Sequence, residues 1–372
     1  MKDIISTYLK KRRFEGPWQF NKPITEHYDF CFAIPAFAEF EALPQTLLSI
    51  AKQNPTLLLK TIVIITINNA VDSQSEVINN NQATIEYLKS VNLPYELRYI
   101  DASSSGFELP LKHAGVGLAR KIGMDLALPL LNTDGLICCI DADSPIAENY
   151  LDIVDNWKAS SNLPVCALGF HHVVEELNLE NPIRAYEKFL RSTATKMKDA
   201  GSPYGYHSIG STIVCRANEY ATIGGMPKRK ATEDYYFLQE FAKYKGVDSI
   251  DEVLVYPSAR ASERVYLGTG FRMNQALTGF DISSLHYADN AYHILKEWLD
   301  IGTGGYNRSL GSVLSKCDDI HPNFHTFIIN EKIEKVWDGL QNSSPTNHHF
   351  IKQFHRWFDG LKTIRLLKYF SK

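Results

Sequence analysis

The stretch "GLICCIDADSPIAENY", residues 135–150, decides how this chain is interpreted. An apolar run, "GLICCI", leads directly into two aspartates, Asp141 and Asp143, which are separated by one alanine. In an extended segment, residues i and i+2 point to the same side. The two carboxylates are therefore expected to converge just beyond a buried strand. Like charges at short range repel each other or raise a pKa, so the pair calls for a compensating partner.

The carboxylate pair has two interpretations. Mg²⁺ and Mn²⁺ prefer oxygen ligands and are commonly held by one or two carboxylates together with substrate phosphates. The short side chain of Ala142 leaves room for such a ligand to approach. Alternatively, Asp143 or Ser144 caps a helix whose first residue is Pro145. The pair by itself does not separate these interpretations.

The composition is that of an ordinary globular protein. The chain has 372 residues, of which 44% are hydrophobic and 22% charged, and this length suits two or three domains or one elaborated domain. A formal net charge of -3 gives no reason to expect a nucleic-acid binder. No apolar run approaches the roughly 20 residues that span a bilayer, and the first residues do not resemble a signal peptide.

The six cysteines indicate the compartment. No pair of them has the spacing of a metal site, and most lie within apolar, strand-like runs. They are therefore expected to be buried, reduced thiols. Reduced thiols predict a cytoplasmic protein.

The first half of the chain alternates apolar runs with amphipathic segments. Strands are predicted at 29–35, 60–67, 95–101 and 135–141, and helices at 40–53, 78–91 and 114–130. Further strands are predicted at 165–170, 208–215 and 251–257, and further helices at 182–199, 233–244 and through most of 284–372. Apolar strands that alternate with helices predict an α/β fold with a mainly parallel sheet covered by helices on both faces.

Polar side chains follow the ends of the first four predicted strands. They occur at Pro35 to Glu39, Asn68 to Asp72, Asp101, and Asp141 to Asp143. Because ligands of such sheets bind at the carboxyl ends of the strands, near a switch in strand order, we expect these groups to line one site.

Three segments carry a family resemblance. They are "CFAIPAFAEFEALPQTLLSIAKQ" (31–53), "ICCIDADSPIAENYL" (137–151) and "GGMPKRKATEDYYF" (224–237). In this order and spacing they resemble the opening strand and helix, the Asp-any-Asp metal motif and the Gly-Gly…Glu-Asp acceptor-side motif of family 2 glycosyltransferases with the GT-A fold. The resemblance covers roughly residues 28–270.

The resemblance implies site roles. Asp143 would bind Mn²⁺ or Mg²⁺ directly, and Asp141 would contact the ribose or complete the metal shell. Asp234 would be the general base of an inverting transfer, and Glu233 would orient the acceptor. Pro35, Ala36, Glu39, Asn68 and Asp101 would lie on the side of the donor, a UDP- or GDP-sugar.

The chain also departs from the family pattern. Ala38 replaces the usual asparagine before the first glutamate, and the second strand ends in "TINNAVDS" (66–73) rather than in an aspartate-rich turn. Both positions resemble nucleotide-contacting ones, so the base of the donor is left open. The Gln-x-x-Arg-Trp motif and the membrane helices of processive members are absent from the sequence.

Several candidate residues have a structural alternative. Asp234 and Glu233 could complement the dipole of a helix capped by Thr232. Arg120 follows Gly115 and Gly117 near a predicted helix start, where cations and backbone amides suit phosphate, although a solvated surface helix explains it equally well. Arg260 and Arg264 belong to a glycine-containing loop and are predicted to bind the diphosphate or an anionic acceptor. His286 is a further candidate metal ligand, although a lone histidine is more often structural.

The C-terminal segment, residues 350–372, has aromatic side chains near one helical face and is basic. Such a helix can lie on an anionic membrane surface, or it can pack on the catalytic domain or on a second subunit. We expect a protein that is cytoplasmic, with peripheral contact to the inner face of a membrane as the alternative.

These observations predict a metal-dependent glycosyltransferase that acts on a glycan, a lipid-linked or a small-molecule acceptor. We divide the chain into an N-terminal extension (1–27), a nucleotide-sugar-binding half (28–164), an acceptor-side half (165–283) and a helical C-terminal region (284–372). Two rival enzymatic functions remain open, and a non-catalytic sugar- or nucleotide-binding module is a third alternative. One is a retaining GT-A enzyme acting on a small anionic acceptor, and the other is a sugar nucleotidyltransferase, which normally needs a glycine-rich phosphate loop that "AIPAFAEFEAL" (33–43) is not.

Overall fold

The computed structural model describes residues 3–262 and 267–372. The chain forms two compact units. The first, called the sheet unit below, comprises residues 1–184, 208–241 and 245–280. The second, called the helical unit, comprises residues 185–207, 242–244 and 281–372.

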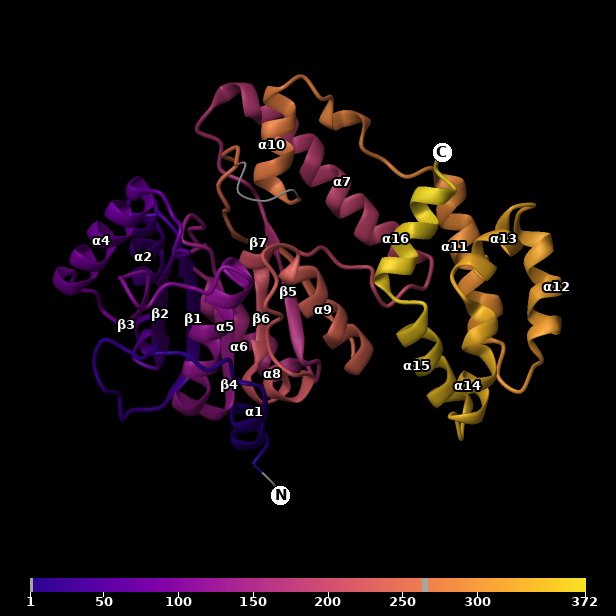
Figure 1. Ribbon diagram of the computed structural model, residues 1–372, viewed down its shortest axis with the longest axis horizontal. Helices are drawn as coiled ribbons and strands as arrows, with labels where there is room; N and C mark the ends of the chain where they lie inside the picture. The colour runs from indigo at the N-terminus through magenta and orange to yellow at the C-terminus, as the bar shows by residue number, and fades with distance from the viewer. Residues whose placement is uncertain (1–2, 263–266) are drawn as a thin grey trace. The chain divides into compact units, whose positions relative to one another are not determined.

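The sheet unit is built on a seven-stranded sheet with the order β3-β2-β1-β4-β6-β5-β7. Its strands are β1 (Tyr28–Ala36), β2 (Thr61–Asn68), β3 (Glu96–Ala102), β4 (Leu131–Cys139), β5 (Val165–Phe170), β6 (Ile213–Arg216) and β7 (Asp248–Val255). β6 runs against both of its neighbours, whereas the other pairings are parallel. The predicted α/β class with a mainly parallel sheet is therefore confirmed (Figure 1).

Helices cover both faces of this sheet. The helices assigned wholly or in part to the sheet unit are α1 (Ile4–Arg12), α2 (Leu43–Ala51), α3 (Pro55–Leu58), α4 (Ser75–Ser90), α5 (Val116–Ala127), α6 (Tyr150–Ser160), α7 (Glu180–Asp199), α8 (Ala217–Ile223), α9 (Glu233–Tyr244) and α10 (Thr269–Leu277). One apolar core joins α2, α4 and α6 to alternate residues of the central strands, such as Phe32 and Ile34. α5 and α8 contact the strands outside this core. Every residue of β2, "TIVIITIN", is buried, as expected for a strand covered on both faces.

The helical unit confirms the expectation that residues 284–372 are mainly helical. Its helices are α11 (Asp289–Thr303), α12 (Leu310–Ile320), α13 (Phe324–Asn330), α14 (Trp337–Asn342), α15 (Asn347–Trp357) and α16 (Gly360–Tyr369). They share an aromatic core in which Trp298 contacts Phe324, Phe354 and Phe358. Phe350, Phe354 and Phe358 of the basic C-terminal segment are buried in that core.

Several predicted boundaries are wrong: β4 spans Leu131–Cys139 rather than 135–141, and β7 spans Asp248–Val255 rather than 251–257. β6 begins at Ile213 rather than at 208, because residues 210–212 form a turn of 3₁₀ helix. α6 begins at Tyr150 rather than at Pro145. All six cysteines are buried, free thiols, as predicted. Within residues 3–262 and 267–372, no helix is long and apolar enough to cross a lipid bilayer.

Candidate functional site

The candidate site lies at the carboxyl-terminal edge of the sheet. The chain passes from β1 through β2 to β3 on one side, then returns to β4 on the other side of β1. This reversal creates a switch point between β1 and β4, the place where open α/β sheets bind ligands. Glu39 follows β1, and Asp141 and Asp143 follow β4. The two chemically suggestive segments thus meet at one edge.

The segment after β4 does not enter a helix. Residues 143–147 instead lie along the end of β7. The Ala147 N–H donates to the Leu254 carbonyl oxygen at 2.9 Å, and the Ser258 N–H donates to the Asp143 carbonyl oxygen at 3.1 Å. The alternative in which Asp143 or Ser144 caps a helix beginning at Pro145 is therefore wrong. The pairing with β7 brings the loop after β7 to Asp143.

Arg260, in that loop, joins the two sides of the switch point. Its Nη2 atom lies 2.8 Å from Oδ2 of Asp143 and 2.5 Å from both carboxylate oxygens of Glu39. Burial lowers the pKa of Arg260, but the two carboxylates outweigh this effect and raise it overall. The guanidinium is about two-fifths exposed, at 39%, so a ligand from solvent can still reach it.

Arg120 makes a second bridge between two carboxylates of the site. It is buried on α5 and donates to Asp141 and, at 2.6 Å, to Oε1 of Glu233. Burial opposes its charge, but Asp141 and Glu233 raise its pKa overall. A buried guanidinium is tolerated because it is paired with two carboxylates. This contact connects the end of β4 to the start of α9.

Glu233 and Asp234 occupy the first turn of α9. Burial raises the pKa of Glu233, and the neighbouring charge of Asp234 adds to the rise while Arg120 opposes it. Burial also raises the pKa of Asp234, against the Tyr235 N–H, which donates to Oδ1 at 2.7 Å. Two interacting acids of this kind titrate as a pair. One of them is thus poised to hold or accept a proton near neutral pH.

Thr232 does not cap α9 with its side chain. Its Oγ1 donates to the Ala231 carbonyl oxygen at 2.6 Å. Its φ is 63°, in the left-handed region, which is unusual for a β-branched residue and marks local strain. Thr232 thus occupies the N-cap position with the two acids in the first turn, as considered, but its side chain makes no capping hydrogen bond, and its strained backbone directly precedes the acidic pair.

The glycines before Arg120 serve packing. A Cβ on Gly117 would lie 2.4 Å from the Arg229 carbonyl oxygen, and one on Gly115 would lie 2.7 Å from the Lys230 Cα. The Gly117 N–H also donates to the Arg229 carbonyl oxygen at 3.2 Å. The start of α5 is therefore covered by the loop of residues 227–230, and its glycines permit that close approach.

The ends of β1 and β2 are held by an amide network. Asn68 donates to the Ala36 carbonyl oxygen at 2.9 Å, and Asn81 of α4 donates to the Asn68 carbonyl oxygen at 3.0 Å. The Ala38 N–H donates to Asn81 Oδ1 at 2.9 Å. Ala38 has a φ of 53°, a conformation in which asparagine or glycine is less strained. Asn81 was missed in the sequence, where its signal is the run "NNN" (79–81) within a helix, since asparagine is a poor helix former.

Asp101 is engaged locally. It accepts hydrogen bonds of 2.9 Å from the backbone and side chain of Ser103 and from the backbone of Ser104. Burial raises its pKa, but these hydrogen bonds outweigh burial and lower it overall. Asp101 therefore stabilises the loop after β3 as an anion. Pro35 and Ala36 are buried at the end of β1. Their contact with a donor stays a prediction.

Two site candidates from the sequence remain, His286 and Arg264. His286 belongs to the helical unit, is exposed, and has its Nδ1 2.8 Å from the Ser284 carbonyl oxygen. Arg264 lies outside the described residues. Arg272 on α10 donates to Gln275 at 2.7 Å. The metal role of His286 and the donor role of Arg264 stay predictions.

The charges of the site favour a further cation. Five acidic side chains gather around two arginines: Glu39, Asp141, Asp143, Glu233 and Asp234 with Arg120 and Arg260. Among residues 3–262 and 267–372, no three acidic, histidine or cysteine side chains form a ready metal cage. One or two carboxylates completed by substrate phosphates are, however, the usual setting for Mg²⁺ or Mn²⁺. Asp141 and Asp143 fit a cation of that kind.

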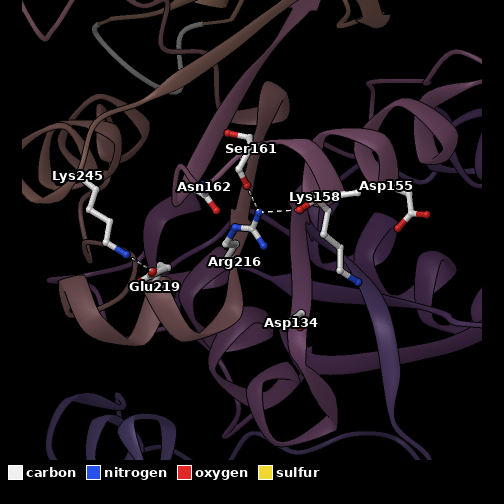
Figure 2. A pocket seen from close by; sticks show the side chains of 9 residues that line it. Asp134, Asp155, Lys158, Ser161, Asn162, Arg216, Glu219 and Lys245 are labelled. Atoms are coloured by element: carbon white, nitrogen blue, oxygen red, sulfur yellow. Dashed lines mark hydrogen bonds and ion pairs between the residues drawn. The ribbon is translucent and has the colours of Figure 1, made fainter.

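A separate polar hollow, of about 540 Å³, lies near the start of β4 and the end of β6 (Figure 2). It is lined by Asp134, Asp155, Lys158, Ala159, Ser161, Asn162, Arg216, Glu219 and Lys245. There Nη2 of Arg216 donates hydrogen bonds to the carbonyl oxygens of Lys158 and Ser161, at 2.9 and 2.6 Å. Acidic and basic side chains balance in this hollow, so its charge selects no ligand.

Comparison with known proteins found solved structures of similar fold. The TarS fragment 1–349 from S. aureus in complex with UDP-GlcNAc is 13% identical, with a TM-score of 0.45 over 88% of this chain and 91% of that one. The mannosyltransferase PcManGT from Pyrobaculum calidifontis, in complex with GDP-Man and Mn²⁺, is 12% identical, with a TM-score of 0.45 over 97% and 94%. No family model and no curated protein matches the sequence. Because both TM-scores lie below 0.5, the function is argued from this chain's own residues.

Proposed function

We propose that the protein is a glycosyltransferase that moves a sugar from a nucleoside diphosphate sugar to a hydroxyl group. One observation carries the proposal: Arg260 and Arg120 link four carboxylates from three separate segments at the switch point of the sheet. A site of paired acids with one buried and one partly exposed arginine suits a diphosphate leaving group, a divalent cation and proton transfer at one place.

Asp143 and Asp141 would hold Mn²⁺ or Mg²⁺, which when bound neutralises the diphosphate that departs. Arg260 adds a guanidinium beside the same carboxylate and can donate to phosphate oxygens. Asn68 and Asn81 keep the chain after β1 in place against the donor. The donor is a UDP- or GDP-sugar, as expected from the resemblance.

Asp234 would take the proton of the acceptor hydroxyl as the new glycosidic bond forms. Its raised pKa brings it closer to the working pH, which favours a general base. Arg120 fixes Glu233, the preceding residue, and thereby the first turn of α9. Direct displacement with such a base inverts the anomeric configuration, and proton NMR of the product distinguishes this outcome from the retaining alternative.

The proposal is tested by thermal unfolding of the whole protein with a panel of UDP- and GDP-sugars, with and without Mn²⁺. We expect one nucleotide sugar to raise the midpoint temperature only when Mn²⁺ is present, because a ligand that binds the folded state stabilises it. Asp143→Asn should abolish that shift. The matched control is Asp338→Asn, an exposed acid of the helical unit.

Release of nucleoside diphosphate then reports turnover. Release of pyrophosphate instead would identify the nucleotidyltransferase alternative. If no nucleotide sugar shifts the unfolding midpoint of the wild-type protein, the proposed function is wrong.

A further inference from the structure

Five exposed cations from three distant segments lie close together in the sheet unit. They are Arg12 at the end of α1, Lys112 before α5, and Lys228, Arg229 and Lys230 in the loop before α9. The group is called the basic patch below. It stands out in a chain whose formal net charge is -3.

A buried polar cluster fixes α1, and with it Arg12, to the sheet unit. The Tyr8 hydroxyl donates to Asp125 at 2.7 Å and also contacts the Lys121 ammonium. Tyr220 of α8 donates to the same Asp125 oxygen at 2.7 Å. α1 accordingly packs beside α8 (Figure 1). Arg12 is close enough to Lys121 for its charge to help lower the pKa of that ammonium, after burial, which is the main cause.

Aromatic contacts connect the other two segments. Phe14, two residues after Arg12, packs edge-on against His113, with ring centroids 5.7 Å apart. The Lys228 ammonium lies 4.6 Å from the centroid of the Phe14 ring. Phe14 therefore joins the segment after α1 to both the turn before α5 and the loop before α9.

The basic patch lies next to the segment that carries Asp234, the proposed general base. The Arg229 guanidinium lies 3.6 Å from the centroid of the Tyr236 ring, and Tyr236 lies two residues after Asp234. Lys230 is packed at the backbone against Gly115, in front of the helix that carries Arg120. A molecule bound to the patch would thus lie along the segment that supplies the general base.

The cations of the patch are not neutralised within the protein. Across residues 3–262 and 267–372, none of the five forms an ion pair. Their side chains are exposed. Clustered cations raise the positive potential of this surface, which favours an anionic ligand there.

We propose that the basic patch binds an acceptor that carries several phosphate groups. The proposal rests on the glycosyltransferase function and specifies its acceptor class. Lysine and arginine together suit phosphate, because the ammonium supplies a compact charge and the guanidinium a two-pronged donor. Three contributing segments require a ligand with more than one anionic group. A membrane fits less well, because Trp18, which stacks on Phe14, is buried rather than exposed for insertion.

The test is fluorescence anisotropy with labelled linear inorganic polyphosphate and the full-length chain. The patch variant is Lys228→Gln with Arg229→Gln and Lys230→Gln. The matched control, Lys296→Gln with Lys316→Gln and Lys335→Gln, removes the same charge from exposed positions of the helical unit. We expect the patch variant to bind about tenfold more weakly or worse, as the loss of three phosphate contacts implies, and the control to bind like the wild type.

A second variant, Arg12→Gln with Lys112→Gln, tests whether the three segments act as one surface. It should also weaken polyphosphate binding, and its effect should shrink as salt is added. Equal binding by this variant and the wild type, or no binding by the wild type, overturns the proposal. Vesicles of POPC with POPG form the third arm: if the patch mediates vesicle binding but not polyphosphate binding, its ligand is a membrane and the proposal is wrong.

Failure of this proposal can be told apart from failure of the enzyme function. The patch variants retain Asp143, Asp234 and both bridging arginines, so the unfolding shift caused by the nucleotide sugar and Mn²⁺ should persist in them. A protein that shows this shift but does not bind polyphosphate keeps its proposed function and lacks the proposed acceptor class.

Discussion

Nη2 of Arg260 lies 2.8 Å from Oδ2 of Asp143. The contact joins the loop after β7 to the aspartate after β4, and Glu39 accepts a hydrogen bond from the same nitrogen. A guanidinium therefore already compensates the carboxylate that would hold the cation. Cation binding at Asp143 must work against that ion pair, which gives Arg260 a measurable influence on metal affinity.

Arg260→Gln is expected to raise the Mn²⁺ affinity of the nucleotide-free protein several-fold, because it removes one ion-pair partner of Asp143 and a positive charge beside the site. Titration of the free Mn²⁺ signal by electron paramagnetic resonance measures the change. Arg272→Gln is the matched control, since Arg272 donates to Gln275 rather than to a carboxylate of the site. An unchanged or lower affinity in Arg260→Gln would show that Asp143 does not bind the metal.

Asp234→Asn is expected to lower turnover by about 10²- to 10⁴-fold, the usual contribution of a general base. Binding of the nucleotide sugar should change little, because the amide preserves the shape of the side chain. The rate of nucleoside diphosphate release and the thermal shift give these two quantities separately. Glu240→Gln, an exposed residue of the same helix, is the control. A rate within a few-fold of the wild type would remove Asp234 from the reaction.

The pH dependence of turnover follows from the same carboxyl group. A base acts when deprotonated, and burial raises the pKa of Asp234 to about 6, compared with about 3.9 for an ordinary aspartate. We expect kcat/KM to be constant above neutral pH and to fall as the pH drops through about 6. Asp234→Asn should lose this acid limb. A profile that stays flat down to pH values near 4 would contradict the assignment.

Arg120→Met is expected to lower the free energy of unfolding by about 3–5 kcal/mol, because removal of the buried guanidinium leaves the buried Glu233 with uncompensated charge and also takes away the partner of the partly exposed Asp141. Urea unfolding of the two proteins measures the difference. Lys89→Met is a suitable comparison, since Lys89 and its partner Glu86 are both exposed and lie within one helix, where little change in the free energy of unfolding is expected. Equal losses in the two variants would mean that the Arg120 bridge contributes little.

The main strands, and the position of the carboxylates at strand ends, could be predicted from the sequence. The β-branched run of β2 and the apolar run before Asp141 have patterns typical of buried strands, and both strands occur. Glu39, Asp141 and Asp143 were placed at strand ends, where the sheet brings them to one edge. Local patterns carry this information because the ends of parallel strands share a side of the sheet.

The partners of those carboxylates could not be predicted. Pro145 is a favourable first residue of a helix, yet residues 143–147 pair with the end of β7 instead. That pairing depends on the register of strands far apart in the sequence, and it alone brings Arg260 to Asp143. The sequence leaves Arg120 either as a phosphate ligand at a helix start or on a solvated surface helix, but the structure buries it between Asp141 and Glu233.

The central claim is that the carboxylates after β4 bind a divalent cation together with a nucleoside diphosphate. Electron paramagnetic resonance of Mn²⁺, titrated with the protein in the presence of UDP or GDP, tests it most directly. We predict that the wild type and Asp338→Asn remove the free Mn²⁺ signal with one of the two nucleotides, whereas Asp143→Asn leaves it in solution. Equal Mn²⁺ binding by Asp143→Asn and the wild type, or no binding by the wild type with either nucleotide, would contradict the claim.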